Sequence, residues 1–137
     1  DGYCADLTRT FVSGRITGDW FKEIYQAVWQ AQQAGVASLR AGATAKDVDA
    51  AARRIINDAG YGAHFGHGLG HGVGLEVHET PRLNMQSETV LQAGMAVTVE
   101  PGIYLPGRGG VRIEDLTVVT ETGCEVLTEL PKELQVI

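Results

Sequence analysis

The sequence predicts an α+β domain in which an antiparallel sheet is covered on one face by helices. Two stretches with apolar residues at helical spacing lie between residues 19 and 60. Short runs rich in β-branched residues, separated by glycine and proline, precede residue 13 and follow residue 94. Between the helices and the later strands lies HFGHGLGHGVGLEVHE, residues 64–79, which contains all four histidines of the chain. The order is therefore a strand, two helices, a glycine–histidine segment and further strands.

The first two elements follow from composition and period. Residues 3–12, YCADLTRTFV, are rich in β-formers and stop at Ser13–Gly14, which predicts a strand. Asp19–Leu39 is predicted to be a long helix, ended by Ala41-Gly42-Ala43. Trp29 is expected to pack in the core. The apolar stripe of this helix comprises Trp20, Ile24, Ala27, Val28 and Ala31.

A second helix is expected after Thr44. Thr44-Ala45-Lys46-Asp47 resembles a capping box with Asp in place of the usual Glu, and Gly60 is placed to cap the C-terminal end. One face of this helix carries Val48, Ala51, Ala52, Ile55 and Ile56. Further strands are expected over Met95–Tyr104, Val111–Thr120 and Cys124–Leu127, with a tight loop over Pro106–Gly110.

Composition limits the class of protein. A chain of 137 residues, 44% hydrophobic and 20% charged, fits one globular domain over residues 1–137. A net charge of −6 without a basic stripe argues against a nucleic-acid partner. No apolar run approaches the roughly 18 residues of a membrane span. Cys4 and Cys124 lie far apart without CxxC spacing, so both are expected to be reduced and buried in a cytoplasmic protein.

The beginning of the chain also carries an expectation. It starts Asp1-Gly2-Tyr3, without methionine and without the basic and apolar regions of a signal peptide. We therefore expect a processed or excised piece of a longer protein.

Glycine occupies every second position from 66 to 74. Each would cost about 1 kcal/mol relative to alanine inside a helix, so a loop or an extended strand with close backbone approaches is expected. Three known motifs fail here. No glycine of the segment starts a GxGxxG pattern, no Gly-Lys-Ser/Thr is present, and the second histidine of an HExxH motif starting at His78 is replaced by Arg82.

Metal binding remains. Imidazole is the commonest metal ligand among side chains, and carboxylates have to supply the other ligands because no cysteine is near. Asp6, Glu100 and Glu114 each lie within an apolar strand pattern, where a charge needs a partner or a metal. One such acid alone would be read as a residue at a sheet edge that faces water. Three of them beside a histidine segment favour a site for Mn²⁺, Co²⁺ or Zn²⁺ over Cu²⁺.

Four motifs in order, DLTRTF, HGLGHGVGLEVHE, VTVEPGIY and GVRIED, resemble the prolidase and aminopeptidase P branch of the pita-bread metallopeptidases. The resemblance covers almost the whole chain and implies a partial pita-bread fold. It also implies two divalent metal ions, with Mn²⁺ as the first candidate and Co²⁺ or Zn²⁺ as alternatives, which activate a bridging water. By motif matching, Asp6 and Glu114 would bridge the metals, His71 would bind one of them, and Glu100 would be a ligand and the proton shuttle.

The same resemblance implies a substrate side. His67 and His78 would line the cleft, bind the substrate and stabilise the oxyanion, without ligating metal. Arg112 would bind substrate or stand behind the ligands, and Tyr104 would help to wall a proline pocket. His64 matches no family role and is interpreted as a residue of the surface or of the site's surroundings. The implied activity is hydrolysis of Xaa-Pro bonds in proline-containing peptides, by a dipeptidase or an aminopeptidase, and a homodimer is a candidate assembly because dimers are common in the family.

One departure is clear. The family's fifth ligand, an aspartate eleven residues before Asp6, would fall ahead of residue 1. This predicts an N-terminally truncated catalytic domain with one weakened metal position, and it leaves the activity of the isolated chain open. Two alternatives are a pita-bread binding module without peptidase activity and a creatinase-like hydrolase that acts without metal. The four retained metal-ligand positions argue against both.

Overall fold

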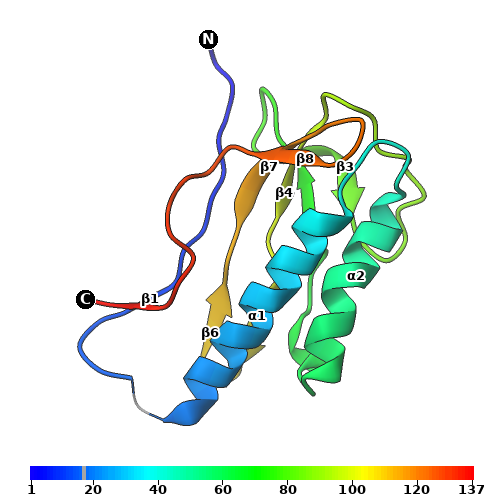
Figure 1. Cartoon of the computed structure of the whole chain (residues 1–137). Coiled ribbons are helices and arrows are strands. Elements are labelled where there is room, and N and C mark those ends of the chain that lie inside the picture. Colours follow the sequence, from blue (N-terminus) through cyan, green and yellow to red (C-terminus); the bar gives the residue numbers. More distant parts are fainter. Residues whose placement is uncertain (17) are drawn as a thin grey trace.

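Both predicted helices are present in the computed structural model, which describes residues 1–16 and 18–137. Helix α1 spans Asp19–Ser38 and α2 spans Ala45–Asp58, and the two lie side by side in opposite directions (Figure 1). The backbone N–H of Asp47 donates to Thr44 Oγ1 at the start of α2, and Gly60 adopts a φ of +85° just after its end. The expected capping at both ends is thus confirmed.

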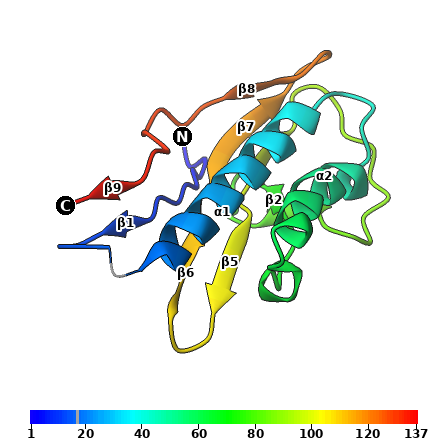
Figure 2. The same cartoon turned by 60° about the horizontal axis from the view of Figure 1, so that its bottom comes forward.

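The strands form one main sheet and two small ladders. The main sheet is antiparallel throughout, in the order β3-β2-β4-β7-β8. Strands β5 and β6 form a separate hairpin that projects from the body (Figure 2), and β1 pairs with β9 in parallel. A short 3₁₀ turn, η1, spans Gly62–His64. The strands are β1 Phe11–Val12, β2 Gly70–Gly72, β3 Glu79–Leu83, β4 Ala96–Val99, β5 Gly102–Leu105, β6 Gly109–Arg112, β7 Asp115–Val119, β8 Cys124–Val126 and β9 Gln135–Val136.

The helices cover one face of the main sheet, and the core lies between them (Figure 1). The predicted apolar faces supply it: Ile24 and Val28 from α1 and Ile56 from α2 pack in one cluster with Val97 and Val99 of β4. Trp20 and Trp29 are partly buried against this cluster. The predicted fold class is confirmed, because burying two amphipathic helices on one sheet face is the α+β solution that the sequence pattern indicated.

Two long strands expected after residue 94 are each broken in the structure. The stretch Met95–Tyr104 divides into β4 and β5 at Glu100–Pro101, and Val111–Thr120 divides between β6 and β7 at Ile113–Glu114. Proline has no N–H to donate to a ladder. The N–H of Glu100 still donates to Leu69 O, next to β2. At Pro101 the chain leaves the main sheet and enters the hairpin.

The first expected strand is largely wrong. Of residues 3–12, only Phe11–Val12 forms a strand, and Thr8 makes an isolated bridge to Glu114. The segment reaches a different neighbour at each point, with Cys4 N donating to Gly74 O and Glu114 N donating to Thr8 O. A continuous ladder cannot form on partners that change in this way.

The cysteines are free, as expected, but both are half-buried and not fully buried. Cys4 lies in the segment that contacts Gly74 and Leu75, and Cys124 begins β8, an edge strand of the main sheet. Among the described residues, no helix has the length and apolar character needed to cross a membrane.

Candidate metal centre and cleft

The two strand breaks place Glu100 and Glu114 beside each other. Val99 pairs with Asp115 at the end of the β4–β7 ladder, and Gly102 pairs with Arg112 at the end of the β5–β6 ladder. Glu100 and Glu114 therefore occupy the gap between two ladders, where their backbone groups are held by neither. This gap is the floor of the site.

His71 lies on β2, the neighbour of β4, and is 5% exposed. Its backbone N–H donates to Thr98 Oγ1 at 3.0 Å, and its Nδ1 lies 3.0 Å from Gly72 O. Because a carbonyl oxygen can only accept, Nδ1 carries a proton, which leaves Nε2 as the nitrogen that can offer a lone pair to a metal. Nε2 lies 3.1 Å from Glu100 Oε1 and 3.7 Å from Asp6 Oδ2.

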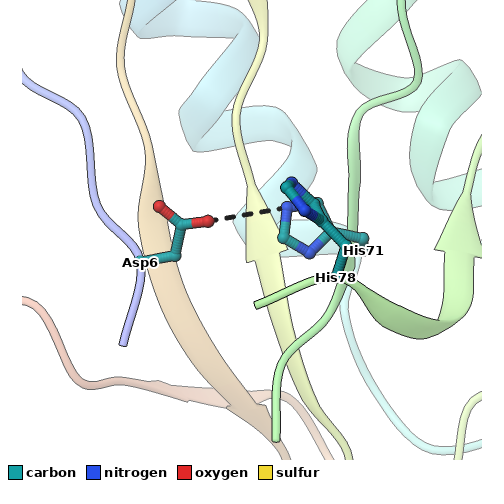
Figure 3. A group of neighbouring side chains, drawn as sticks. All are labelled: Asp6, His71 and His78. Carbon is teal, nitrogen blue, oxygen red and sulfur yellow. Dashed lines mark ion pairs between the residues drawn. The ribbon is translucent and has the colours of Figure 1, made fainter. Parts of the chain in front are cut away.

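Asp6 and His78 complete a second group around the same imidazole (Figure 3). Ligand atoms of Asp6, His71 and His78 lie within 4.8 Å of one another, as do those of His71, Glu100 and Glu114. The rings of His71 and His78 are 4.3 Å apart between centroids. The structure thus brings together Asp6, His71, Glu100 and Glu114, the four residues matched to metal ligands, and it adds His78, which was assigned to the substrate side.

Glu114 is the most buried of the three acids of this site, at 2% exposure. Its Oε2 accepts a hydrogen bond of 2.6 Å from Thr8 Oγ1, whereas Oε1 has no hydrogen-bond partner among the described residues. Burial raises the pKa of this carboxyl, and the nearby carboxylates of Glu100 and Asp6 raise it further. A buried oxygen without a donor is costly unless something else satisfies it.

These residues fit a divalent cation. His71 Nε2 faces carboxylate oxygens, and Glu114, whose Oε1 is unpartnered among the described residues, belongs to the same group. A cation between them would convert repulsion into ligation. The donor set of carboxylate oxygens and imidazole suits Mn²⁺, Co²⁺ or Zn²⁺.

The glycines beside His71 are required by close backbone contacts. A Cβ on Gly70 would overlap the carbonyl oxygen of Thr98 in β4, and a Cβ on Gly72 would overlap that of Thr80 in β3. β2 is thus pressed between two strands, and the expected close backbone approach is confirmed. Side chains at 70 and 72 would push His71 away from the acids.

The predicted substrate residues line a cleft of about 710 Å³ over this centre. His67 Nε2 lies 2.9 Å from the Tyr104 hydroxyl, and Arg112 Nη1 donates to the same hydroxyl at 3.4 Å. His64 lies instead beside Tyr61, with ring centroids 6.4 Å apart. The cleft is lined by Asp6, His67, Gly68, Gly70, His71, Val77, His78, Arg82, Asn84, Glu100, Tyr104, Arg112 and Glu114.

Two threonines of the site were missed by the sequence reading. Thr8 Oγ1 donates to Glu114 and accepts from Arg112 Nε at 3.2 Å. Thr98 Oγ1 accepts from His71 and donates to Glu100 Oε1 at 3.1 Å. A signal was available, because Thr8 lies two residues after Asp6 and Thr98 lies two before Glu100, so each shares a face with its acid in extended backbone.

The fold and this cluster define a metallopeptidase-like centre. Residues 1–121 match the model of Metallopeptidase family M24, and the chain belongs to this family. The sequence is 53% identical over 136 residues to the uncharacterized peptidase YqhT of Bacillus subtilis strain 168, covering 99% of this chain and 38% of that protein. It is 52% identical over 132 residues to an Xaa-Pro dipeptidase of Pyrococcus horikoshii, covering 96% of this chain and 37% of that protein.

Solved structures agree on the fold. An Xaa-Pro dipeptidase from Bacillus anthracis superposes with a TM-score of 0.97 at 55% identity, over 99% of this chain and 38% of that one. An X-Pro aminopeptidase from Thermotoga maritima superposes with a TM-score of 0.95 at 46% identity, over 99% and 38%. The chain thus spans less than two fifths of the length of these relatives.

Proposed function

We propose that this chain carries metal-binding residues of a peptidase that hydrolyses Xaa-Pro peptide bonds. Asp6, His71, Glu100 and Glu114 would hold two divalent ions, Mn²⁺ before Co²⁺ or Zn²⁺. Such a pair of ions supplies an activated water and stabilises the charge that develops on the scissile carbonyl. The observation that supports this most directly is His71 Nε2, which faces two carboxylates at 3.1 and 3.7 Å.

The remaining residues take roles that their positions allow. Glu100 is 16% exposed at the base of the cleft, so it can hold a proton and pass it to the leaving amine. His67 and His78 reach the cleft and would bind the peptide and stabilise its oxyanion. Tyr104 and Arg112 stand together on the β5–β6 hairpin and would form the wall against a proline ring.

The proposal includes a proline-containing peptide as substrate and a cytoplasmic location, which the two free cysteines support. Relatives named as dipeptidases and as an aminopeptidase both resemble the chain, so the length of the peptide is decided by the test below. By family resemblance, the proposed assembly is a homodimer.

The test has two parts. First, the chain is dialysed against trace Mn²⁺ and the metal per chain is measured by mass spectrometry. We expect bound metal that is lost in His71→Ala.

Second, release of proline from an Xaa-Pro dipeptide and of the first residue from a longer Xaa-Pro peptide is measured for the chain and for a longer protein that contains it. Glu100→Ala should abolish either activity, whereas Glu125→Ala, a change of an exposed acid on β8, should not. Activity retained in Glu100→Ala contradicts the proposal. Metal binding without hydrolysis favours the binding-module alternative.

A further inference from the structure

Helix α2 carries an ion pair that holds the histidine segment from behind. Asp49 and Arg53 are one helical turn apart, which places them on the same face. Arg53 Nε lies 2.8 Å from Asp49 Oδ2, and Arg53 Nη2 lies 2.9 Å from Asp49 Oδ1. The Asp49 side chain is 0% exposed and that of Arg53 is 13% exposed. The pair is therefore two-pronged and shielded from water.

The same two side chains satisfy three backbone groups of residues 65–69. Arg53 Nη1 donates to Phe65 O at 3.1 Å, and Nη2 donates to His67 O at 2.8 Å. Asp49 Oδ1 accepts from the N–H of Leu69 at 3.0 Å. These residues lie between η1 and β2, outside any strand, so side chains of α2 take the place of a neighbouring strand.

The rings are fixed as well. The Arg53 guanidinium carbon lies 4.1 Å from the centroid of the Phe65 ring, and this ring meets His67 edge to face, with centroids 5.0 Å apart. His67 Nδ1 lies 2.7 Å from Gly68 O, so Nδ1 carries the proton and Nε2 is left to accept from Tyr104. The backbone of His67 is thus held from α2 while its ring reaches the cleft.

We infer that Asp49 and Arg53 are positioning residues, which fix the place and the tautomer of His67 in the cleft from the opposite side of the loop. Neither lines the cleft over the metal centre. Leu69 extends the device, because its N–H is held by Asp49 and its carbonyl accepts from the N–H of Glu100 at 2.7 Å. The substrate-side histidine and the backbone of Glu100 are thereby tied to one ion pair. The catalytic consequence rests on the proposed function, whereas the positioning itself does not.

Arg53→Lys separates the charge from the geometry. Lysine can still pair with Asp49, but a single ammonium group lacks the planar fork that reaches Asp49, Phe65 O and His67 O together. Arg54→Lys is the matched control, because Arg54 is the next residue on the helix and is exposed. Asp49→Asn is a second variant, since its amide oxygen still accepts from Leu69 while the charge that orients Arg53 is gone.

The first readout needs no activity. The imidazole nitrogens of the four histidines are observed by NMR in the metal-free chain, with the signal of His67 assigned through His67→Ala. We expect the Nδ1-protonated form in the wild type and in Arg54→Lys, and an averaged tautomer signal for His67 in Arg53→Lys and Asp49→Asn. An unchanged His67 signal in either folded variant overturns the inference, and so does an equal change in Arg54→Lys.

The second readout is a double-mutant cycle on kcat/KM with an Xaa-Pro dipeptide, at equal metal content. In the background that keeps His67, Arg53→Lys should lower kcat/KM by up to about 100-fold, as expected when the His67 imidazole is misplaced. It should have little further effect in a His67→Ala background. Independent losses in the two backgrounds would show that Arg53 acts elsewhere. If neither the chain nor the longer protein that contains it hydrolyses the peptide, the proposed function fails, and the NMR result still decides the positioning inference.

Discussion

Arg9 Nη2 lies 2.7 Å from Asp115 Oδ1 in an ion pair whose side chains are 2% and 0% exposed. Arg9 Nη1 also donates to the backbone carbonyls of Thr8 and Glu114, at 2.9 and 2.5 Å. One guanidinium therefore joins the segment that carries Asp6 to the strand that follows Glu114. Asp115 additionally accepts from Gln32, Thr128 and Lys132. Although burial opposes ionisation, the hydrogen bonds from Lys132, Thr128 and Arg9 hold the pKa of Asp115 below its ordinary value.

Arg9→Met should therefore be strongly destabilising. It leaves a buried carboxylate with one cation fewer, for which a loss of about 3–5 kcal/mol in unfolding free energy is expected. Urea unfolding of the metal-free chain measures this loss. Lys46→Met is the control, because it breaks an exposed pair with Glu88 and should cost no more than about 1 kcal/mol. Similar losses of unfolding free energy in the two variants would show that the buried Arg9–Asp115 pair stabilises the fold no more than the exposed Lys46–Glu88 pair.

Glu114→Gln should separate metal binding from stability. The substitution keeps the shape but removes the charge on a buried carboxyl whose Oε1 has no partner in the described part of the chain. We expect Mn²⁺ affinity, measured by titration calorimetry, to fall by more than about 100-fold. Substituting a residue that only orients a metal ligand already lowers metal affinity by about 10–100-fold. The metal-free chain should keep or gain stability at pH 7, since burial raises the pKa of Glu114 and penalises its charged form.

Glu121→Gln is the control for this result, because Glu121 is exposed in the turn before β8. It should change neither the Mn²⁺ affinity nor the stability. Wild-type affinity in Glu114→Gln would remove Glu114 from the ligand set.

Much of the fold was predictable because its signals are local. The helical stripes, the Thr44 cap and Gly60 depend on residues within a few positions of one another, and all appear in the structure as expected. Asp6, Glu100 and Glu114 were singled out because a charge within an apolar strand pattern is costly. That they would meet around His71 was an expectation from the motif resemblance alone, and the structure places them there.

The remainder depends on contacts between distant parts of the chain. The hydrogen bond between Thr8 and Glu114 spans 106 positions, and the bond between Arg53 and His67 joins a helix to a loop with no shared pattern. The breaks at Glu100–Pro101 and Ile113–Glu114 also escaped prediction, although Pro101 was a visible signal. Hydrophobic periodicity and residue propensity describe one segment at a time. They do not reveal which distant residues make the hydrogen bonds that a strand partner would otherwise make.

Gly70→Ala tests whether the glycine spacing serves the site. The added Cβ would overlap Thr98 O, so β2 or β4 must shift, at a cost of about 3 kcal/mol. Thermal and urea unfolding measure the loss, and Mn²⁺ titration should show weaker binding because His71 moves with β2. Gly66→Ala lies in the same segment but meets no atom within 4 Å, so it should stay within about 0.5 kcal/mol of the wild type. Equal behaviour of the two variants would contradict the steric explanation.

Thr98→Val tests the hydroxyl that joins two proposed ligands. Thr98 is 0% exposed, and its Oγ1 accepts from the N–H of His71 and donates to Glu100 Oε1. Valine keeps the shape but leaves the buried N–H of His71 without an acceptor, for which a loss of about 1–3 kcal/mol is expected. Mn²⁺ affinity should fall about 10–100-fold, since both ligands lose their orientation.

Thr117→Val is the matched control, because Thr117 is equally buried and its hydroxyl donates to Val97 O, away from the ligands. It should reduce stability without changing the Mn²⁺ affinity. The two variants therefore separate a hydroxyl that orients ligands from one that only stabilises the sheet. If both lower the affinity alike, the metal centre responds to the stability of the whole sheet, and Thr98 has no specific part in placing His71 and Glu100.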